Sequence, residues 1–371
     1  MDKDLASIQE AREKITTAYD AWKMWSHATQ ADVDRVCEAM ANAGIQAAER
    51  LGQMAHDETG FGIPAHKKLK NIVATKAVWE SIRAVKTVGV INHDPQRRIY
   101  DIAWPMGVIT GLVPSTNPTS TTLYKALIAV KARNAIVFSP HPSAARCTYE
   151  AAYVMAQAAE RAGAPHGLID CMQHISLQGT QELMTHKRTA LILATGGTPM
   201  VRAAHSTGKP AYGVGPGNVP VYVDRSADLD KAARYIVASK AFDCSTICAT
   251  EQAVIADRPI AARLAELMYA QGAYFCNEPE TNALRKALFH PDGSMNTAVV
   301  GKPAAFVAAY AGFSIPDSAR VLVTPLVKVG REEPLAHEKL TTVLAWYEVE
   351  GWERGCEVSL AMIDSGGRGH T

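Results

Sequence analysis

Two cysteines four residues apart occur in FDCSTICATEQ, residues 242–252, and either sulfur could do covalent chemistry. A cysteine attacks a carbonyl carbon as its thiolate, which needs a lowered pKa and access to the substrate. The alternative is that Cys244 and Cys248 are small buried hydrophobic residues, as lone cysteines usually are. Neither sulfur has an adjacent histidine as a base. We predict no metal site, because no CxxC pair occurs and no histidine stands at zinc spacing from either sulfur.

Two polar turns elsewhere could polarise a carbonyl or bind a ligand. Asn117, in PSTNPTS, follows an apolar run, where a side-chain amide can donate to a developing oxyanion. Asparagine beside proline is also ordinary turn chemistry. Thr195, Gly196 and Gly197, in LATGGTPM, precede the start of a predicted helix, where a phosphate could approach, but the run is not a GxGxxG fingerprint.

Three further candidate sites could also be explained without any function. Gly215 lies in GVGPGN, which could be only a tight turn; no Asp or Glu occurs from residue 209 to 223. Glu338, in LAHEKLTTVLAWYE, could form a surface ion pair. Pro140 and His141, in SPHPSA, could be loop residues without a ligand. None of these sites is decisive by itself.

The elements that must position these residues alternate between apolar strands and amphipathic helices. Such alternation predicts an α/β fold with a mostly parallel sheet covered on both faces, and ligands of such sheets bind at the carboxyl ends of the strands. PSTNPTS, SPHPSA and TGGTPM stand at those ends. The predicted strands are residues 107–113, 134–140 and 189–195, and the predicted helices between them are residues 121–133 and 144–163.

The rest of the chain supplies two more features. Residues 3–54 have the apolar spacing of two helices, and the alternation on either side of HDPQ predicts a β-hairpin over about 86–103. We expect a first domain over residues 1–225, which contains this hairpin. A second domain over residues 226–371 follows, with Cys248 between a helix and a strand.

Composition excludes several classes of function. The 371 residues contain 38 Lys and Arg against 37 Asp and Glu, which leaves no basic surplus for nucleic acid. The charged start MDKDLASIQEAREKI is not a secretory signal, and no apolar run reaches the length of a membrane span. Seven cysteines without such a signal are expected to be thiols in a cytoplasmic protein.

Six motifs in order carry a family resemblance: VPSTNPTST, FSPHPSAA, LATGGTPMV, GVGPGNVPV, FDCSTICATEQ and HEKLTTVLAWY. In this order they resemble the CoA-acylating aldehyde dehydrogenases, including acetaldehyde and propionaldehyde dehydrogenases of bacterial microcompartments. They also resemble the aldehyde-oxidising half of bifunctional aldehyde–alcohol dehydrogenases. The resemblance covers essentially the whole chain. It implies an aldehyde dehydrogenase fold, with a Rossmann-type parallel-sheet domain, an α/β catalytic domain and an oligomerisation hairpin.

The resemblance also implies a role for each candidate. Cys248 matches the catalytic nucleophile, and Asn117 matches the amide that stabilises the oxyanion together with the Cys248 backbone N–H. Cys244 stands where the family commonly has asparagine, so we expect it to take no part. The implied cofactor-binding residues are Thr195, Gly196 and Gly197 at the dinucleotide turn, Glu338 at the nicotinamide ribose, Pro140 and His141 at the adenosine end, and Gly215.

The implied reaction is that of an acetylating acetaldehyde dehydrogenase: aldehyde, NAD⁺ and CoA give acyl-CoA and NADH through a Cys248 thioester. Hydrolytic relatives resemble one another in a glutamate at an ELGGK-like turn. GVGPGN offers no acid there, which favours transfer to the strongly nucleophilic CoA thiol. NADP remains open as cofactor. An acidic aldehyde, succinate semialdehyde or sulfoacetaldehyde, would need a cation in the pocket, for which Arg202 and Lys240 are the candidates.

Relatives continue beyond the final GGRGHT, so the resemblance implies that the C-terminal part of the catalytic domain is missing here. That part normally adds a strand to the oligomerisation sheet. A catalytically impaired member with an assembly role is therefore the competing interpretation. Family habit implies a homodimer or homotetramer, and a microcompartment or an alcohol dehydrogenase as a partner.

Overall fold

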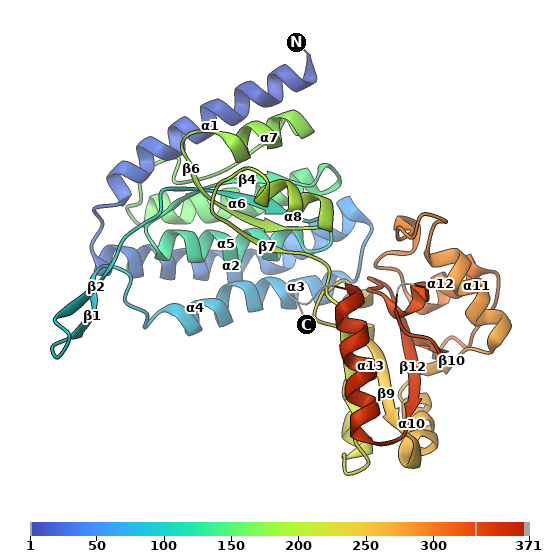
Figure 1. Ribbon diagram of the computed structural model, residues 1–371. Coiled ribbons are helices and arrows are strands. Elements are labelled where there is room, and N and C mark those ends of the chain that lie inside the picture. Colours follow the sequence, from blue (N-terminus) through green and yellow to red (C-terminus); the bar gives the residue numbers. More distant parts are fainter. Residues whose placement is uncertain (1, 331, 367–371) are drawn as a thin grey trace. The chain divides into compact units, whose positions relative to one another are not determined.

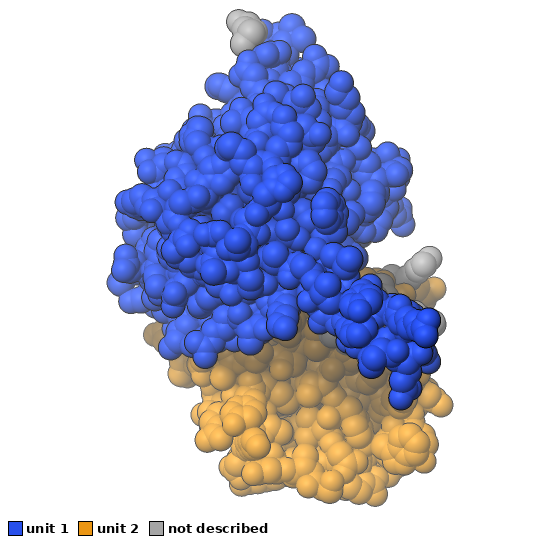
Figure 2. Space-filling view, turned by 90° about the vertical axis from the view of Figure 1, so that its left-hand side faces the viewer, with its two compact units in different colours: residues 1–60, 64–214 blue, residues 61–63, 215–371 orange. Residues whose placement is uncertain are grey.

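The computed structural model describes residues 2–330 and 332–366 of the chain, so the end of GGRGHT from residue 367 lies outside the described residues. The chain divides into two compact units, which Figure 2 colours separately. Unit 1 comprises residues 1–60 and 64–214, and unit 2 comprises residues 61–63 and 215–371. The division falls at residue 215, ahead of the predicted boundary at 225. The functional labels of the two domains stay predictions.

Unit 1 is built on a parallel sheet with the strand order β5-β4-β3-β6-β7. The chain moves outward from β3 to β5 and then returns to β6 on the other side of β3, so the order reverses between β3 and β6. Strands β3 and β4 are buried throughout, which explains their continuous apolar sequences. The strands are β3 (Val108–Val113), β4 (Ala135–Pro140), β5 (Ile169–Cys171), β6 (Thr189–Thr195) and β7 (Ala211–Val214).

Helices cover both faces of this sheet (Figure 1). Helices α5 and α6 pack on one face, with α2 outside them, while α1 contacts β3, β4 and β5 and packs on α7. Helix α2 begins with a capping box between Thr29 and Asp32 and ends at Gly60 with a φ of 69°. The helices of unit 1 are α1 (Lys3–Trp25), α2 (Gln30–Thr59), α3 (Pro64–Ile72), α4 (Val78–Ile82), α5 (Pro118–Lys131), α6 (Ala145–Arg161), α7 (Leu177–Thr185) and α8 (Thr198–His205), with a π-helical turn at Val73–Ala77 and a 3₁₀ turn at Pro142–Ala144.

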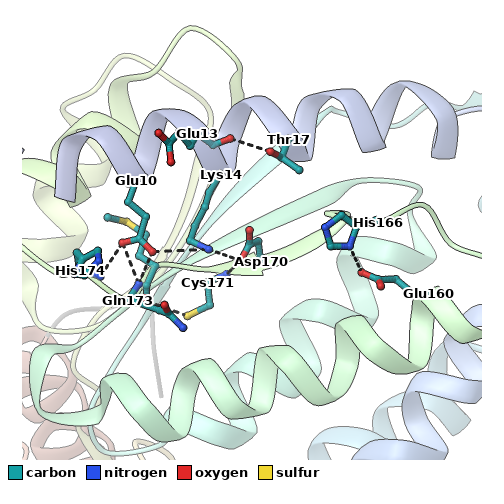
Figure 3. Close-up of polar contacts among 11 residues, drawn as sticks. Glu10, Glu13, Lys14, Thr17, Glu160, His166, Asp170, Cys171, Gln173 and His174 are labelled. Atoms are coloured by element: carbon teal, nitrogen blue, oxygen red, sulfur yellow. Dashed lines mark hydrogen bonds and ion pairs between the residues drawn. The ribbon is translucent and has the colours of Figure 1, made fainter. Parts of the chain in front are cut away.

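Polar contacts attach α1 to the edge of the sheet (Figure 3). The Glu10 carboxylate accepts hydrogen bonds from the backbone N–H groups of Gln173 (2.9 Å) and His174 (2.7 Å). One helical turn later, Lys14 Nζ lies 2.7 Å from Asp170 Oδ1 on β5. The N-terminal helix is therefore an integral layer of unit 1.

The predicted hairpin is confirmed. Strand β1 (Gly89–Asp94) pairs antiparallel with β2 (Ile99–Ala103), and nearly all of its side chains are exposed. Its apolar side chains include Val90, 51% exposed, and Ile102, 62% exposed. Its part in oligomerisation stays a prediction.

Unit 2 has a second parallel sheet, with the order β10-β11-β12-β9-β8. Alternate residues of β9 enter different cores: Val254 and Ala256 pack with α9 and α10, whereas Ala253 and Ile255 pack with α13. The strands are β8 (Val219–Val223), β9 (Glu251–Asp257), β10 (Ala273–Phe275), β11 (Val321–Pro325) and β12 (Val343–Val349), and the helices are α9 (Leu229–Ala241), α10 (Arg258–Ala270), α11 (Glu278–Leu288), α12 (Ala304–Ala311) and α13 (Gly351–Gly366), with 3₁₀ turns at Phe242–Ser245, Thr297–Val299 and Pro334–Ala336.

The predicted fold class, α/β with parallel sheets and a hairpin, is therefore confirmed. Over residues 2–330 and 332–366, no helix combines the length and the apolar character that crossing a bilayer requires.

Candidate active site

Exposure separates the two cysteines of FDCSTICATEQ. Cys248 is partly exposed, whereas Cys244 is 3% exposed, and all seven cysteines of the chain are outside disulfides. Cys248 follows the 3₁₀ turn Phe242–Ser245 and precedes β9, as the sequence predicted. A nucleophile must be reachable, so this location suits Cys248 and not Cys244.

The segment before Cys248 has an unusual backbone. Asp243, Cys244 and Ser245 have φ values of 49°, 50° and 62°, a left-handed conformation that costs a non-glycine residue roughly 1–2 kcal/mol. The fully buried Asp243 carboxylate offsets this cost. Oδ1 accepts a hydrogen bond from the Ile63 N–H at 2.6 Å, and Oδ2 accepts one from Thr246 Oγ1 at 2.6 Å. The segment before Cys248 is thus held in a strained shape by a buried anchor, an arrangement that recurs at functional sites.

Asn117 has a defined amide orientation. It follows β3 and precedes Pro118, the first residue of α5. Asn117 Oδ1 accepts a hydrogen bond of 2.7 Å from Lys70 Nζ, and Nδ2 donates to Thr116 Oγ1 at 3.2 Å. An ammonium can only donate, so the amide oxygen must face Lys70 and the NH₂ group must face away. One amide N–H of Asn117 is left for a further acceptor.

The strand-end residues of unit 1 lie along one edge of the sheet. Val113 of β3 pairs with Pro140 of β4, and Leu112 pairs with Ala194, next to Thr195. The backbone N–H of His141 donates to the Val113 carbonyl at 3.1 Å. The structure therefore brings Pro140, His141 and Thr195 to the carboxyl edge of the same sheet.

The glycines of the predicted dinucleotide turn have open surroundings. A Cβ atom at Gly196 or Gly197 would meet its nearest neighbour at 3.6 or 3.7 Å, an ordinary contact, and one at Gly215 would meet nothing within 4 Å. Internal packing therefore does not require glycine at these positions. Close approach of a ligand to the backbone would still explain why glycine stands at these positions.

Lys125 is a buried cation next to the carboxyl edge of the sheet that sequence reasoning missed. Its Nζ donates to the carbonyls of Leu112 and Leu193, both at 2.8 Å, and so joins β3 to β6 where the strand order reverses. Burial lowers the pKa of Lys125 to about 7. A lysine inside the apolar run LYKALIAVK was the available signal.

Glu338 is not a surface ion-pair partner. It is partly buried, and its Oε1 accepts a hydrogen bond of 3.1 Å from the Gly217 N–H, two residues beyond Gly215. Burial raises the pKa of Glu338 to about 7. Unit 2 thus places the GVGPGN turn beside the one carboxyl that the resemblance assigns to the cofactor.

The two candidate cations for an acidic aldehyde differ in environment. Lys240 is fully buried and donates to Gln252 Oε1 at 3.1 Å, so it does not face an open pocket. Arg202 is exposed on α8. Within the described ranges, no group of three His, Cys, Asp or Glu side chains could hold a metal ion.

A small pocket of unit 1 lies away from all these residues. It has a volume of about 160 Å³ and is lined by α6 and by residues 166–171, including Tyr153, Glu160 and Asp170. Glu160 is paired there with His166 and Asp170 with Lys14 (Figure 3). None of the sequence-predicted site residues lines it.

Comparison with known families and curated proteins gives a consistent result. The aldehyde dehydrogenase family model matches residues 3–275. The aldehyde-alcohol dehydrogenase of Clostridium acetobutylicum is 39% identical over 99% of this chain and 42% of its own length. The acetylating succinate-semialdehyde dehydrogenase of Clostridium kluyveri is 33% identical over 98% of this chain and 80% of its own. The chain thus spans about two fifths of the length of the bifunctional relatives.

Solved structures of aldehyde dehydrogenases are similar to this chain over nearly its whole length. An acetylating aldehyde dehydrogenase from Geobacillus thermoglucosidasius is 50% identical, with a TM-score of 0.96 over 99% of this chain and 81% of its own. A propionaldehyde dehydrogenase from Rhodopseudomonas palustris, with bound CoA and an acylated cysteine, is 28% identical, with a TM-score of 0.84 over 95% and 80%. An engineered glycolyl-CoA reductase with bound NADP⁺ is 28% identical, with a TM-score of 0.84 over 95% and 79%.

Proposed function

The chain belongs to the aldehyde dehydrogenase family, with acylating members among its relatives, and we propose that it oxidises acetaldehyde or propionaldehyde with NAD⁺ and CoA. The products are acyl-CoA and NADH. The observation that carries the proposal is the partly exposed Cys248 at the end of a strained, anchored segment. The enzymes of this group use NAD or NADP together with CoA.

The proposed chemistry starts at Cys248. Its thiolate adds to the aldehyde carbon, and the carbonyl oxygen takes up the negative charge, which we assign to the Asn117 amide and the Cys248 N–H. Bound NAD⁺ supplies a two-electron acceptor for the hydride of that carbon. The carbon is thereby oxidised and remains on Cys248 as a thioester. Attack by the CoA thiolate then forms acyl-CoA and releases the Cys248 thiolate.

The turn GVGPGN supports CoA over water as the final acceptor. Hydrolysis of a thioester requires a water activated by a positioned base. Residues 209–223 contain no carboxylate, and the carboxyl in contact with the turn, Glu338, is proposed to hold the cofactor ribose. Thr195, Gly196, Gly197, Pro140, His141 and Gly215 complete the proposed dinucleotide site.

The test is NADH formation from acetaldehyde and NAD⁺ with and without CoA. We expect sustained turnover with CoA and, without it, a burst of at most one NADH per chain. Equal steady rates in both mixtures would refute acyl transfer. A Cys248→Ala protein provides the blank.

An acidic aldehyde is the second candidate, because relatives include an acetylating succinate-semialdehyde dehydrogenase and a sulfoacetaldehyde dehydrogenase. The commitment of Lys240 to Gln252 argues against it. A substrate panel that compares acetaldehyde, propionaldehyde and succinate semialdehyde at equal concentration decides between them.

The assembly is also part of the proposal. The exposed apolar hairpin β1–β2 supports a homodimer or homotetramer, which the mass by light scattering tests. A cytoplasmic location is likewise proposed, because seven cysteines outside disulfides suit a reducing compartment. An alcohol dehydrogenase or a microcompartment is proposed as a partner because these terms occur in the names of similar proteins.

A further inference from the structure

Two buried lysines and a glutamine join the segment that carries Glu338 to the strand that follows Cys248. Lys240, Gln252 and Lys339 are all fully buried in unit 2. Gln252 lies on β9, four residues after Cys248, and Lys339 is adjacent to Glu338. None of the three is needed as a reactant in the proposed chemistry.

Lys339 makes the main connection. Its Nζ donates to the backbone carbonyls of Leu335 (2.6 Å), His337 (2.9 Å) and Gln252 (3.2 Å). Its own backbone N–H donates to Gln252 Oε1 at 2.9 Å. The side chain therefore folds the segment 335–339 around its ammonium and at the same time fixes that segment to β9.

The surroundings of the two lysines differ in the number of acceptors. Burial lowers the pKa of Lys339 to about 7, but three carbonyls surround its Nζ, one acceptor for each N–H donor of an ammonium. Lys240 Nζ has two acceptors, Gln252 Oε1 at 3.1 Å and the Lys339 carbonyl at 3.3 Å, which matches the two N–H donors of a neutral amine. Burial, and then the charge of Lys339, hold the pKa of Lys240 well below its usual range.

We propose that Lys339 is a positioning residue of the cofactor site, whose ammonium sets the place of the Glu338 carboxylate relative to the strand that follows Cys248. This inference rests on the proposed function, because it takes Glu338 as the ribose-binding carboxylate. The structural reason is that, among the described residues, the Glu338 carboxyl accepts a single hydrogen bond, from the Gly217 N–H. Its place therefore depends on the backbone around it, and Lys339 holds two carbonyls of the segment that leads into it, those of Leu335 and His337, together with the Gln252 carbonyl on β9.

The test is the substitution Lys339→Met in the full chain, which keeps an unbranched side chain of similar length and removes all three hydrogen bonds. We expect the Kd for NADH, measured by fluorescence titration, and the KM for NAD⁺ to rise about tenfold, because a hydrogen bond to a charged group is worth between about tenfold and a hundredfold in binding. The rate of Cys248 alkylation by iodoacetamide without cofactor should stay within about twofold. Lys286→Met, on the exposed face of α11, is the matched control.

A merely structural role predicts a different pattern: a lower melting temperature and a smaller active fraction, with an unchanged Kd in the molecules that bind. That result would overturn the proposal. If Lys339→Met does not fold, Lys339→Gln is the second variant: its neutral amide has two N–H donors on a shorter side chain and cannot serve all three carbonyls, so the proposal requires its Kd for NADH to rise as well. An unchanged Kd there overturns it.

Failure of the proposed reaction would look different. A wild-type protein that binds NADH but shows no CoA-dependent turnover refutes the reaction and leaves the positioning role measurable, because the Kd needs no turnover. A wild-type protein that binds no NADH refutes both.

Discussion

Removal of the Asn117 amide tests the oxyanion assignment most directly. In Asn117→Ala, the N–H left available by the Lys70 contact is lost, and one lost oxyanion donor costs about 10²–10³ in kcat, or about 2.7–4 kcal/mol. Asn117→Asp should lose at least as much. A carboxylate accepts from Lys70 as the amide oxygen does, and its second oxygen then replaces the NH₂ group and repels the developing negative charge.

Lys70→Met tests the orientation of the same amide. The Asn117 amide stays in place, but the 2.7 Å hydrogen bond that fixes which end faces Lys70 is gone. If the two amide orientations become equally populated, the productive fraction halves, so the expected loss is about twofold. Lys68→Met on the same helix removes a surface ion pair with Glu49 and serves as the matched control.

The assay is the single-turnover burst of NADH at saturating NAD⁺ and aldehyde, which reports the steps up to the thioester without CoA. Melting temperatures and the Kd for NADH should stay near wild type in all four proteins. A burst rate in Asn117→Ala within about twofold of wild type would refute the oxyanion role. So would Asn117→Asp reacting faster than Asn117→Ala.

Three further predictions follow from the site. Cys244→Ala should keep CoA-dependent activity, whereas Cys248→Ala should lose it together with the acyl adduct seen by intact mass; the reverse result would reassign the nucleophile. The pKa of Glu338 is raised to about 7, so its acceptor form grows as the pH rises through about 7, and the affinity for NADH should increase from pH 6 to pH 8 in wild type but not in Glu338→Gln. Asp243→Ala should lower the free energy of unfolding in urea by about 2 kcal/mol, because the buried Thr246 hydroxyl and the part-buried Ile63 N–H lose their acceptor, while Asp243→Asn should cost less; equal losses would contradict the anchor.

The regular elements could be predicted because their patterns are local. Strands β3 and β4 are continuous apolar runs bounded by turn residues, and the hairpin shows alternation around HDPQ. Strand β5 has only three residues and α7 only nine. Neither was predicted, because such short elements give no clear periodic signal. The family could be predicted because six short motifs occur in the family's order.

The site could be predicted only in part. The motifs predict Cys248, Asn117 and Glu338 as site residues, and the structure adds that Cys248 is partly exposed and that Lys70 orients Asn117. Lys125 and Lys339 were missed because lysine in a helix or loop normally indicates a solvated position. Each has at least one carbonyl acceptor from an element far away in the sequence, Leu193 for Lys125 and Gln252 for Lys339.

By itself, the sequence determined the alternation of strands and helices, the nearly balanced charge and the order of the six motifs, because each depends only on residues close together in the chain. Only the tertiary structure decided which cysteine is accessible, which end of the Asn117 amide can donate and which lysines are buried. Those properties depend on neighbours brought together by folding, since solvent access and hydrogen-bond partners are set by the packed molecule and not by the local run of residues.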